Sequence, residues 1–255
     1  MAAMSSQRKV IVAVMWVVSL VVAFLIGTQF SLTPANQAVA PAQTPAPAAP
    51  AASEPAAQPA TTPDAAAAAE LEAYLLDLPR RQAGDPLALG NVDAKVVLTN
   101  WSDYRCPFCA KWHEETFPQL QRYIDDGTLR VEFRDLVIFG QESMDTAVAA
   151  RAAGAQGKFW EYQEAVFSHA PASGHPTIDR AQILAFAQEA GVPDLAAFEA
   201  ALADPAHLAA AQSDTMEAQQ MGISGTPFFV IGGQAINGAQ PIEAFTAAIE
   251  AEAAR

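Results

Sequence analysis

The only two cysteines of this 255-residue chain lie three positions apart, in the stretch WSDYRCPFCAKWH. A β-rich apolar run, 95–101 (KVVLTNW), ends just before Cys106. Apolar residues at helical spacing then follow over 106–126 and stop at Gly127. The pattern predicts a buried strand, a short loop and a helix whose first turn carries both cysteines. This local arrangement restricts the fold more than any other feature of the chain.

A C-x-x-C pair supports three chemistries: a redox dithiol, half of a zinc site, or a structural disulfide. Zinc needs four ligands, and the other candidates are four scattered histidines, of which His113 falls on the helical face of Cys106 and Cys109. A disulfide across so short a loop would restrict the unfolded chain little. Both alternatives are therefore weaker than the redox interpretation, and we expect no metal site.

The redox interpretation agrees with the physics of a helix N-terminus. Unpaired N–H groups and the positive end of the helix dipole favour a thiolate at Cys106. Pro107 fits the first helical turn, where an N–H would have no partner. Cys109, one turn further and facing inward, is expected to resolve mixed disulfides formed at Cys106. The redox group is then the Cys106–Cys109 disulfide itself, and no separate cofactor is expected.

The N-terminus carries an apolar run, Val10–Ile26, that has no charged residue and follows Arg8 and Lys9. A cleaved signal peptide and a retained anchor both start this way, but signal h-regions are shorter, roughly 7–15 residues. The length favours a transmembrane signal anchor over 10–30. Because the positive charges precede the span, we expect residues 1–9 in the cytoplasm and the rest of the chain outside, periplasmic or extracytoplasmic, in a single-pass cell-membrane protein.

Residues 31–69 are rich in alanine and proline, with eight prolines between positions 33 and 69 and no aromatic residue. Such a segment cannot bury enough apolar surface to offset its ordering entropy, so we expect a disordered linker. The folded domain should then occupy 70–255. The whole chain has 14 basic against 28 acidic residues, a net charge of −14. This acidity argues against a nucleic-acid partner.

Beyond residue 70 the periodicities alternate between helix and strand. We expect a helix over 70–79, a small strand at 87–89, the strand and helix around the cysteines, and a second long strand over 129–139. A helical block follows over about 141–222, and Pro118 is expected to kink the cysteine helix. The end of the chain reads as strands at 228–231 and 234–236 and a helix over 241–254. This order suggests an α/β thioredoxin-like fold with a helical insertion.

Several motifs in order resemble the DsbA-like branch of the thioredoxin superfamily: TNWSDYRCPFCAKWHEE, FRDL, SMDTAVAARAAGAQGKFWEYQEAVF and ISGTPFFVIGG. The resemblance covers about residues 78–255. It implies thiol:disulfide oxidoreductase activity outside the cytoplasm. It also implies that Pro227 is a cis proline beside the disulfide, and that the backbone of Thr226 pairs with an extended substrate segment. Pro107 and Phe108 would then contact substrate.

Two positions depart from the best-known DsbA proteins. The residues between the cysteines there are often Pro-His, whereas Phe108 can add neither a donor nor a charge beside the thiolate. Six residues before the nucleophile many relatives carry a buried Glu that moves protons, and Asn100 cannot ionise. Asp103 could partly replace that acid, although an Asp just before a helix is more often a cap. Trp101, Trp112 and Phe108 fit an apolar collar around the site where unfolded substrates rest, and Trp101 fits the core equally well.

We therefore expect an anchored oxidase that introduces disulfides into unfolded or partly folded exported proteins. A membrane quinone-linked reoxidase of the DsbB or VKOR-like (vitamin-K-epoxide-reductase-like) kind is implied by the resemblance alone. The same centre run backwards would make a reductase or isomerase, and the sequence barely separates these directions. A non-catalytic peptide-binding or chaperone module is the alternative from another class. It predicts that Cys106→Ala keeps full activity.

Overall fold

A five-stranded mixed sheet lies at the centre of the described part of the chain. The computed structural model describes residues 65–255. The strands follow the order β1-β3-β2-β4-β5, with β2 and β3 parallel and the other neighbours antiparallel. Every residue of β2 and β3 is buried, as expected for strands covered on both faces. The strands are β1 (Ala88–Leu89), β2 (Val96–Ser102), β3 (Leu129–Asp135), β4 (Phe228–Ile231) and β5 (Gln234–Asn237).

The connection from β2 to β3 is helical because parallel neighbours require the chain to cross a face of the sheet. It consists of α3 (Pro107–Lys111), the π-helical η1 (Trp112–Thr116) and α4 (Phe117–Asp125). The π-helical turn lies just before Pro118, which has no N–H to donate to the preceding turn. The helix irregularity predicted at Pro118 is therefore a π-helical turn just before it.

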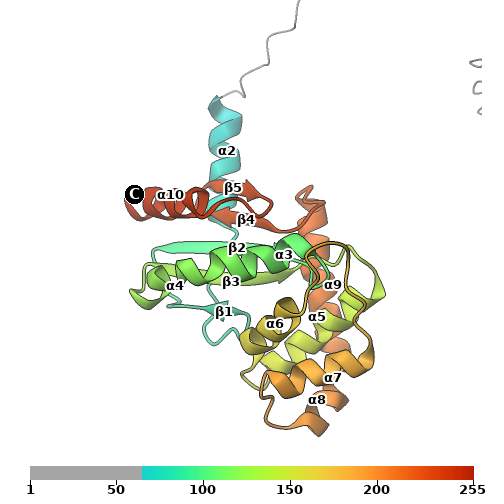
Figure 1. Ribbon diagram of the computed structural model, residues 1–255. Helices are drawn as coiled ribbons and strands as arrows, with labels where there is room; N and C mark the ends of the chain where they lie inside the picture. The colour runs from blue at the N-terminus through green and yellow to red at the C-terminus, as the bar shows by residue number, and fades with distance from the viewer. Residues whose placement is uncertain (1–64) are drawn as a thin grey trace, which may run out of the picture. The chain divides into compact units, whose positions relative to one another are not determined.

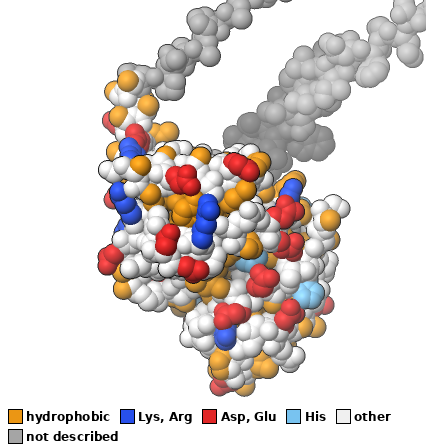
Figure 2. Space-filling model, turned by 60° about the vertical axis from the view of Figure 1, so that its left-hand side comes forward, with side chains coloured by type: hydrophobic (Ala, Val, Ile, Leu, Met, Phe, Trp, Pro, Cys, Tyr) orange, Lys and Arg blue, Asp and Glu red, His pale blue; other side chains and the backbone are white. Residues whose placement is uncertain are grey.

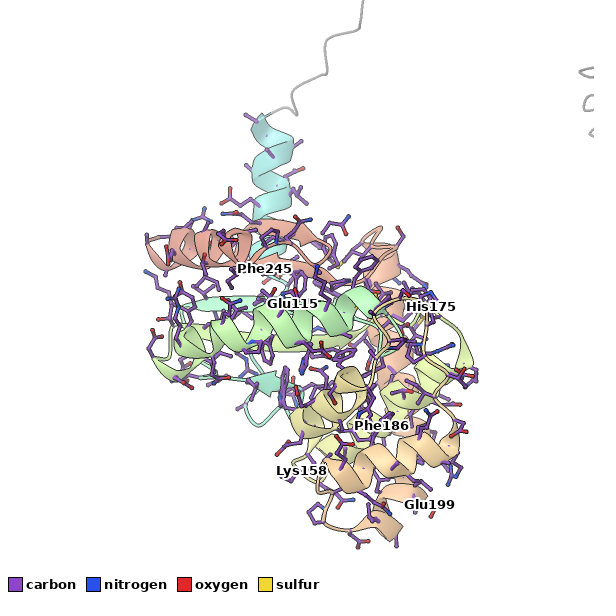
Figure 3. The ribbon with its side chains drawn as sticks, in the orientation of Figure 1. Glu115, Lys158, His175, Phe186, Glu199 and Phe245 are labelled. Atoms are coloured by element: carbon purple, nitrogen blue, oxygen red, sulfur yellow. The ribbon has the colours of Figure 1, made fainter. Side chains whose placement is uncertain are left out.

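An aromatic core joins this connection to the sheet and to α10 (Ile242–Ala253). The ring of Trp112 lies 4.6 Å from that of Phe229 and 5.9 Å from that of Phe245, between centroids. Figure 3 shows Phe245 on α10, close to the sheet. Trp112 is 3% exposed, so it belongs to the core and not to an exposed collar. The same holds for Trp101, which is fully buried on the other face of β2.

The helical block lies between β3 and β4 in the chain and gathers beside the end of the sheet where α3 begins (Figure 1). Asp179, Asp194 and Asp204 each accept a backbone N–H at the start of a helix, which explains where those helices begin. The block's core also buries both cysteines. Its helices are α5 (Gln141–Gly154), α6 (Phe159–Ser168), α7 (Arg180–Glu189), α8 (Leu195–Ala201) and α9 (Pro205–Gln220).

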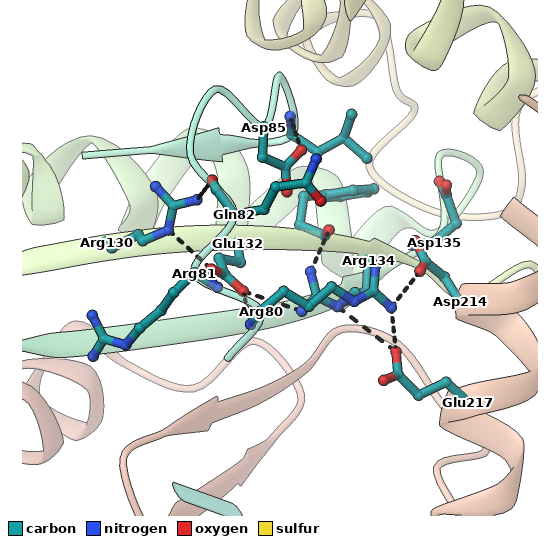
Figure 4. Close-up of polar contacts among 12 residues, drawn as sticks. Arg80, Arg81, Gln82, Asp85, Arg130, Glu132, Arg134, Asp135, Asp214 and Glu217 are labelled. Carbon is teal, nitrogen blue, oxygen red and sulfur yellow. Dashed lines mark hydrogen bonds and ion pairs between the residues drawn. The ribbon is translucent and has the colours of Figure 1, made fainter. Parts of the chain in front are cut away.

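A buried carboxylate ties the segment before β1 to the sheet (Figure 4). Glu132 on β3 accepts the backbone N–H groups of Arg80 and Arg81 at 2.9 and 2.8 Å. It also pairs with the guanidinium groups of Arg130 and Arg134 at 2.9 and 3.1 Å. Burial by itself would raise the pKa of Glu132, but these donors outweigh it and lower the pKa. The segment is therefore held to the centre of the sheet by charge-assisted bonds.

The surface combines acidic side chains with exposed apolar ones (Figure 2). Acidic groups are scattered over the visible face, and apolar side chains run along α2 (Ala65–Leu76). Leu71 and Tyr74 of this helix are 57% and 51% exposed, whereas Leu75 is buried against the sheet. Phe108, beside the cysteines, is 61% exposed. The exposed large apolar side chains of residues 65–255 thus lie along α2, at the start of α3 and on α9, where Leu208 and Met216 are exposed.

Two predicted boundaries are wrong. The predicted linker extends to residue 69, yet α2 begins at Ala65, because a run of alanines is a strong helix former. The predicted strand over 129–139 ends at Asp135, since Ile138 and Phe139 donate their N–H groups to Asp103 instead of to a neighbouring strand. Within residues 65–255 no helix is long and apolar enough to cross a membrane. The predicted anchor and most of the linker lie outside the described residues.

Candidate active site

Cys106 is placed at the first turn of α3 by a tight turn after β2. Its backbone N–H donates to the Asp103 carbonyl oxygen at 3.1 Å, and its own extended conformation makes it the N-cap of the helix. Pro107 follows at the first helical position, as expected. A hydrogen bond from the Cys109 thiol lowers the pKa of Cys106 to about 6 against the effect of burial, and the Thr226 side chain and then backbone N–H groups of the first turn add to this lowering.

The pKa of Cys109 is shifted in the opposite direction. Cys109 is 1% exposed, and burial together with the neighbouring Cys106 raises its pKa well above the ordinary value. Hydrogen bonds from Ser102 and from the Asp103 backbone reduce this rise without removing it. The two thiols are not joined by a disulfide in the structure. One thiol is therefore ready to ionise and the other is held neutral, which is the asymmetry that thiol–disulfide exchange requires.

The loop before β4 lies against Cys106. The sulfur of Cys106 is 3.4 Å from the Thr226 carbonyl oxygen, and the Thr226–Pro227 peptide bond is cis. Pro227 is buried, and its carbonyl accepts the Gly238 N–H at 2.9 Å. The structure thus brings together Cys106 and the Thr226-Pro227 pair, which are far apart in the chain, as the family resemblance implied.

A groove borders the residues between the cysteines. A cavity of about 430 Å³ is lined by Pro107, Phe108 and Lys111 on one side and by the loop 170–174 on the other. The ring of Phe108 projects into solvent beside it. The groove therefore offers apolar surface next to the reactive sulfur.

The loop that forms the far wall of the groove is tied to the active-site turn. The Arg105 guanidinium donates to the carbonyl oxygens of Pro176 and Phe139, both at 2.6 Å. Nδ1 of His175 lies 2.9 Å from the Arg105 carbonyl oxygen, and its ring is 3.8 Å from that of Phe139. Figure 3 shows His175 beside the start of α3. The sequence showed no partner for His175, because these contacts join residues far apart in the chain.

Residues 82–251, about two thirds of the chain, match the thioredoxin family. The chain belongs to the thioredoxin family. The α/β fold predicted from the order of elements is confirmed by this match and by the architecture of residues 65–255.

The chain is also similar over part of its length to individual curated proteins. It is 29% identical over 163 residues to the Na(+)/H(+) antiporter NhaA 1 of Salinispora arenicola, covering 63% of this chain and 24% of that one. It is 31% identical over 91 residues to disulfide bond formation protein D of Bacillus subtilis, covering 34% of this chain and 40% of that one. The chain thus spans less than half the length of these curated relatives.

A solved structure shows the same fold. Oxidised BdbD from Bacillus subtilis superposes with a TM-score of 0.62 and 23% identity. The superposition covers 68% of this chain and 94% of BdbD. The helical block between β3 and β4 falls within the region that matches the family.

Asp103 does not cap the active-site helix, which corrects the sequence-based expectation. Asp103 is buried, and no side chain makes a capping hydrogen bond to the first turn of α3, whose N-cap is Cys106. Its carboxylate accepts the N–H groups of Arg105 and Ile138 and the hydroxyl of Ser143, each at 2.8 Å. Asp103 therefore joins the active-site turn to the chain after β3. Its full set of donors leaves it a structural role and argues against its predicted part in proton transfer.

Asn100 is buried in the middle of β2, paired with Phe133 on one side and Phe229 on the other. Its amide oxygen has no hydrogen-bond partner. It shares the face of Ser102, two residues along the strand, which is the face covered by α3. An amide at this position cannot exchange a proton at ordinary pH, so the predicted relay through Asn100 has no titrating group.

The weaker zinc interpretation finds no support around the cysteines. Among residues 65–255, no group of three or more His, Cys, Asp and Glu side chains lies close enough to hold a metal ion. His113 instead pairs with Glu164, at 2.7 Å between Nε2 and a carboxylate oxygen. Burial lowers the pKa of His113 although Glu164 opposes the shift.

Two polar residues at the inner cysteine were not predicted from the sequence. Ser102 bonds Cys109, and Asp135 lies beside Ser102 at the end of the neighbouring strand. The signal was present: both strands end in a polar residue after a buried apolar run, and the carboxyl ends of parallel strands meet at one edge of a sheet. Asp135 appeared in the motif FRDL, but the predicted strand continued past it and hid its place at the strand end.

Proposed function

We propose that this chain is a thiol:disulfide oxidoreductase that donates the Cys106–Cys109 disulfide to exported proteins. The observation that carries the proposal is the placement of two thiols one helical turn apart: Cys106 is the N-cap of the helix and lies 3.4 Å from the Thr226 carbonyl oxygen, and Cys109 is 1% exposed. A thiol with a pKa of about 6 is roughly nine-tenths ionised near pH 7, against about one in a hundred at the ordinary 9.0. A stabilised thiolate in the reduced form makes the disulfide form a stronger oxidant.

The reaction follows from the placement and the pKa shifts of the two thiols. A substrate thiolate attacks the Cys106 sulfur, the Cys106–Cys109 bond breaks, and Cys109 leaves as a thiolate that takes up a proton. A second substrate thiolate then attacks the substrate sulfur of the mixed disulfide. The substrate leaves with a disulfide, and Cys106 leaves as the stabilised thiolate. Two electrons pass from the substrate to the enzyme dithiol.

The cis Thr226–Pro227 segment and the groove beside Phe108 would form the binding site for the substrate. The Thr226 backbone borders the Cys106 sulfur and precedes the strand β4. An extended substrate segment would pair with this backbone as an added strand, which is a common mode of peptide recognition. Pro107 and the exposed Phe108 would contact apolar side chains that only an unfolded or partly folded substrate exposes.

The proposal places the catalytic domain outside the cytoplasm, held by an anchor over 10–30 and a linker over about 31–64. The uncharged run Val10–Ile26 supports the anchor. Tethering would raise the local concentration at a membrane quinone-linked reoxidase of the DsbB or VKOR-like kind. The name of the Bacillus subtilis relative, disulfide bond formation protein D, supports the direction of the reaction.

The test is the reduction potential of the full-length chain in defined glutathione buffers. A donor of disulfides should lie nearer the about −120 mV of strong oxidants than the about −270 mV of thioredoxin. A value near thioredoxin would establish the reductase direction instead. The matched control is Cys106→Ala, which must abolish the couple; a variant that retained full biological activity would support the non-catalytic peptide-binding alternative.

A further inference from the structure

The inner cysteine presents a proton problem that the groups described above do not solve. When the enzyme disulfide is opened at Cys106, Cys109 is released as a thiolate at a position that is 1% exposed. Burial raises the pKa of Cys109 well above its ordinary value, so the thiolate there is costly. The sulfur must therefore gain a proton as the bond breaks, and lose one when the disulfide forms again.

Ser102 is the side chain that bonds Cys109, and Asp135 is its neighbour across the sheet. Ser102 and Asp135 are partners in the parallel ladder between β2 and β3. Partners in a parallel ladder point to the same face, about 4.8 Å apart. The face is the one that α3 covers, since Ser102 reaches Cys109 there. The side chain of Asp135 thus lies on the cysteine side of the sheet, on the same face as that of its ladder partner Ser102.

Asp135 is a buried carboxyl with a free oxygen. One oxygen accepts from Arg151 at 2.7 Å, while the other, Oδ1, has no hydrogen-bond partner. Arg151 is shared with Asp214, which also accepts the Asp135 backbone N–H at 3.3 Å. Tyr104 and Asp103 are the other titratable groups that act on it. Burial raises the pKa of Asp135 to about 7, Arg151 opposes this, and Asp214 adds to it.

We propose that Asp135 stores the proton that Cys109 gains and loses, and passes it through the Ser102 hydroxyl. As the Cys106–Cys109 bond breaks, the Ser102 hydroxyl gives its proton to the Cys109 sulfur and takes one from the Asp135 carboxyl. The products are a neutral Cys109 thiol, an unchanged Ser102 and an Asp135 carboxylate facing Arg151. The reverse transfer occurs when Cys109 attacks a mixed disulfide. The role rests on the proposed function.

The neighbouring groups are poorer candidates for this role. Asn100 shares the face but cannot ionise. Asp103 lies close to Cys109 through its backbone, but its carboxylate is engaged by donors from the turn and from the chain after β3. Asp214 bonds Arg151 and the backbone N–H of Asp135. It lies on α9 and therefore has no place in the ladder beside Ser102. Asp135 alone among these combines burial, a free oxygen and a position paired with Ser102 in the ladder.

The experiment compares full-length wild type with Asp135→Asn, and uses Asp214→Asn as the matched control on Arg151. The rate at which a small dithiol reduces the oxidised enzyme is followed from pH 5 to 9. The wild-type rate, corrected for ionisation of the attacking thiol, should fall through an inflection near the pKa of about 7. Asp135→Asn should lose that inflection and react at least about 10-fold more slowly below it. Asp214→Asn should keep the inflection and move it to lower pH, because a negative neighbour of Asp135 is gone.

Two further measurements distinguish a failure of the proposed role of Asp135 from a failure of the proposed function. Thiolate absorbance of reduced Asp135→Asn should still report Cys106 titrating near a pKa of about 6, and urea unfolding should show a folded variant. An Asp135→Asn profile that parallels the wild type overturns the role of Asp135 and leaves the proposed function intact. A wild type with no reversible Cys106–Cys109 couple overturns the proposed function itself. If Asp135→Asn is unfolded, Ser102→Ala tests the same relay and must lose the same inflection.

Discussion

Replacing Cys109 with alanine removes the group that most lowers the pKa of Cys106. The Cys109 thiol is the first cause of that shift, ahead of the Thr226 side chain and the backbone N–H groups of the helix, which the variant retains. A hydrogen bond to a charged group contributes about 1.5–3 kcal/mol, and a thiol is a weak donor, so the lower end applies. Since about 1.4 kcal/mol equals one pH unit, the pKa of Cys106 should rise by about one unit. The thiolate fraction near pH 7 should then fall from roughly nine-tenths to about one half.

The assay is the ultraviolet thiolate absorbance of the reduced protein as a function of pH, checked by the rate of alkylation. Cys106→Ala is the control, and it should show no thiolate in the acidic and neutral range because the pKa of Cys109 is raised well above its ordinary value. If Cys109→Ala titrates at the same pH as wild type, the helix N–H groups set the pKa of Cys106 by themselves. The assigned order of causes would then be wrong.

Three further outcomes concern stability. Trp112→Ala should lower the free energy of unfolding by about 3–5 kcal/mol, measured by urea denaturation, because it empties the centre of the aromatic core. Glu132→Gln should cost about 3–5 kcal/mol in the same assay, since it leaves the buried Arg130 and Arg134 without their shared carboxylate; a loss below about 1 kcal/mol would show that solvent reaches the network. Asp135 has a pKa raised from 3.8 to about 7, so its contribution is complete below about pH 4 and is lost as pH rises through 7. Unfolding measured between pH 4 and 8 should therefore show a steeper fall in wild type than in Asp135→Asn, and equal slopes would contradict the raised pKa.

The elements around the cysteines were predictable because their signals are local. The run ending at Trp101 and the helical spacing after Cys106 correspond to β2 and to the helix from α3 to α4. The short strand at 228–231 has the predicted bounds. The end of β3 was not predictable, because Leu136 to Phe139 are as apolar as the strand before them. What ends the strand is the carboxylate of Asp103, which takes the N–H groups that a neighbouring strand would need.

The roles of Asp103 and Asp135 could not be predicted from the sequence either, because they depend on contacts between segments far apart in the chain. An Asp before a helix is usually a cap, and only the tertiary structure shows that Asp103 bonds a loop and Ser143 instead. Asp135 looked like a residue within a strand, and its place beside Ser102 depends on the register of β2 against β3. A pattern within one segment carries no information on register between segments.

The sequence by itself determined the dithiol and the position of its first sulfur. A strand end, a short turn and a helix start within a few residues place Cys106 on the helix N-terminus through local geometry alone. Only the tertiary structure decided what surrounds the two sulfurs. The Thr226 carbonyl reaches Cys106 across a separation of 120 residues, and strand pairing places Asp135 beside Ser102. Such contacts arise when distant segments bury a common core, so they depend on the whole domain and not on any one stretch of it.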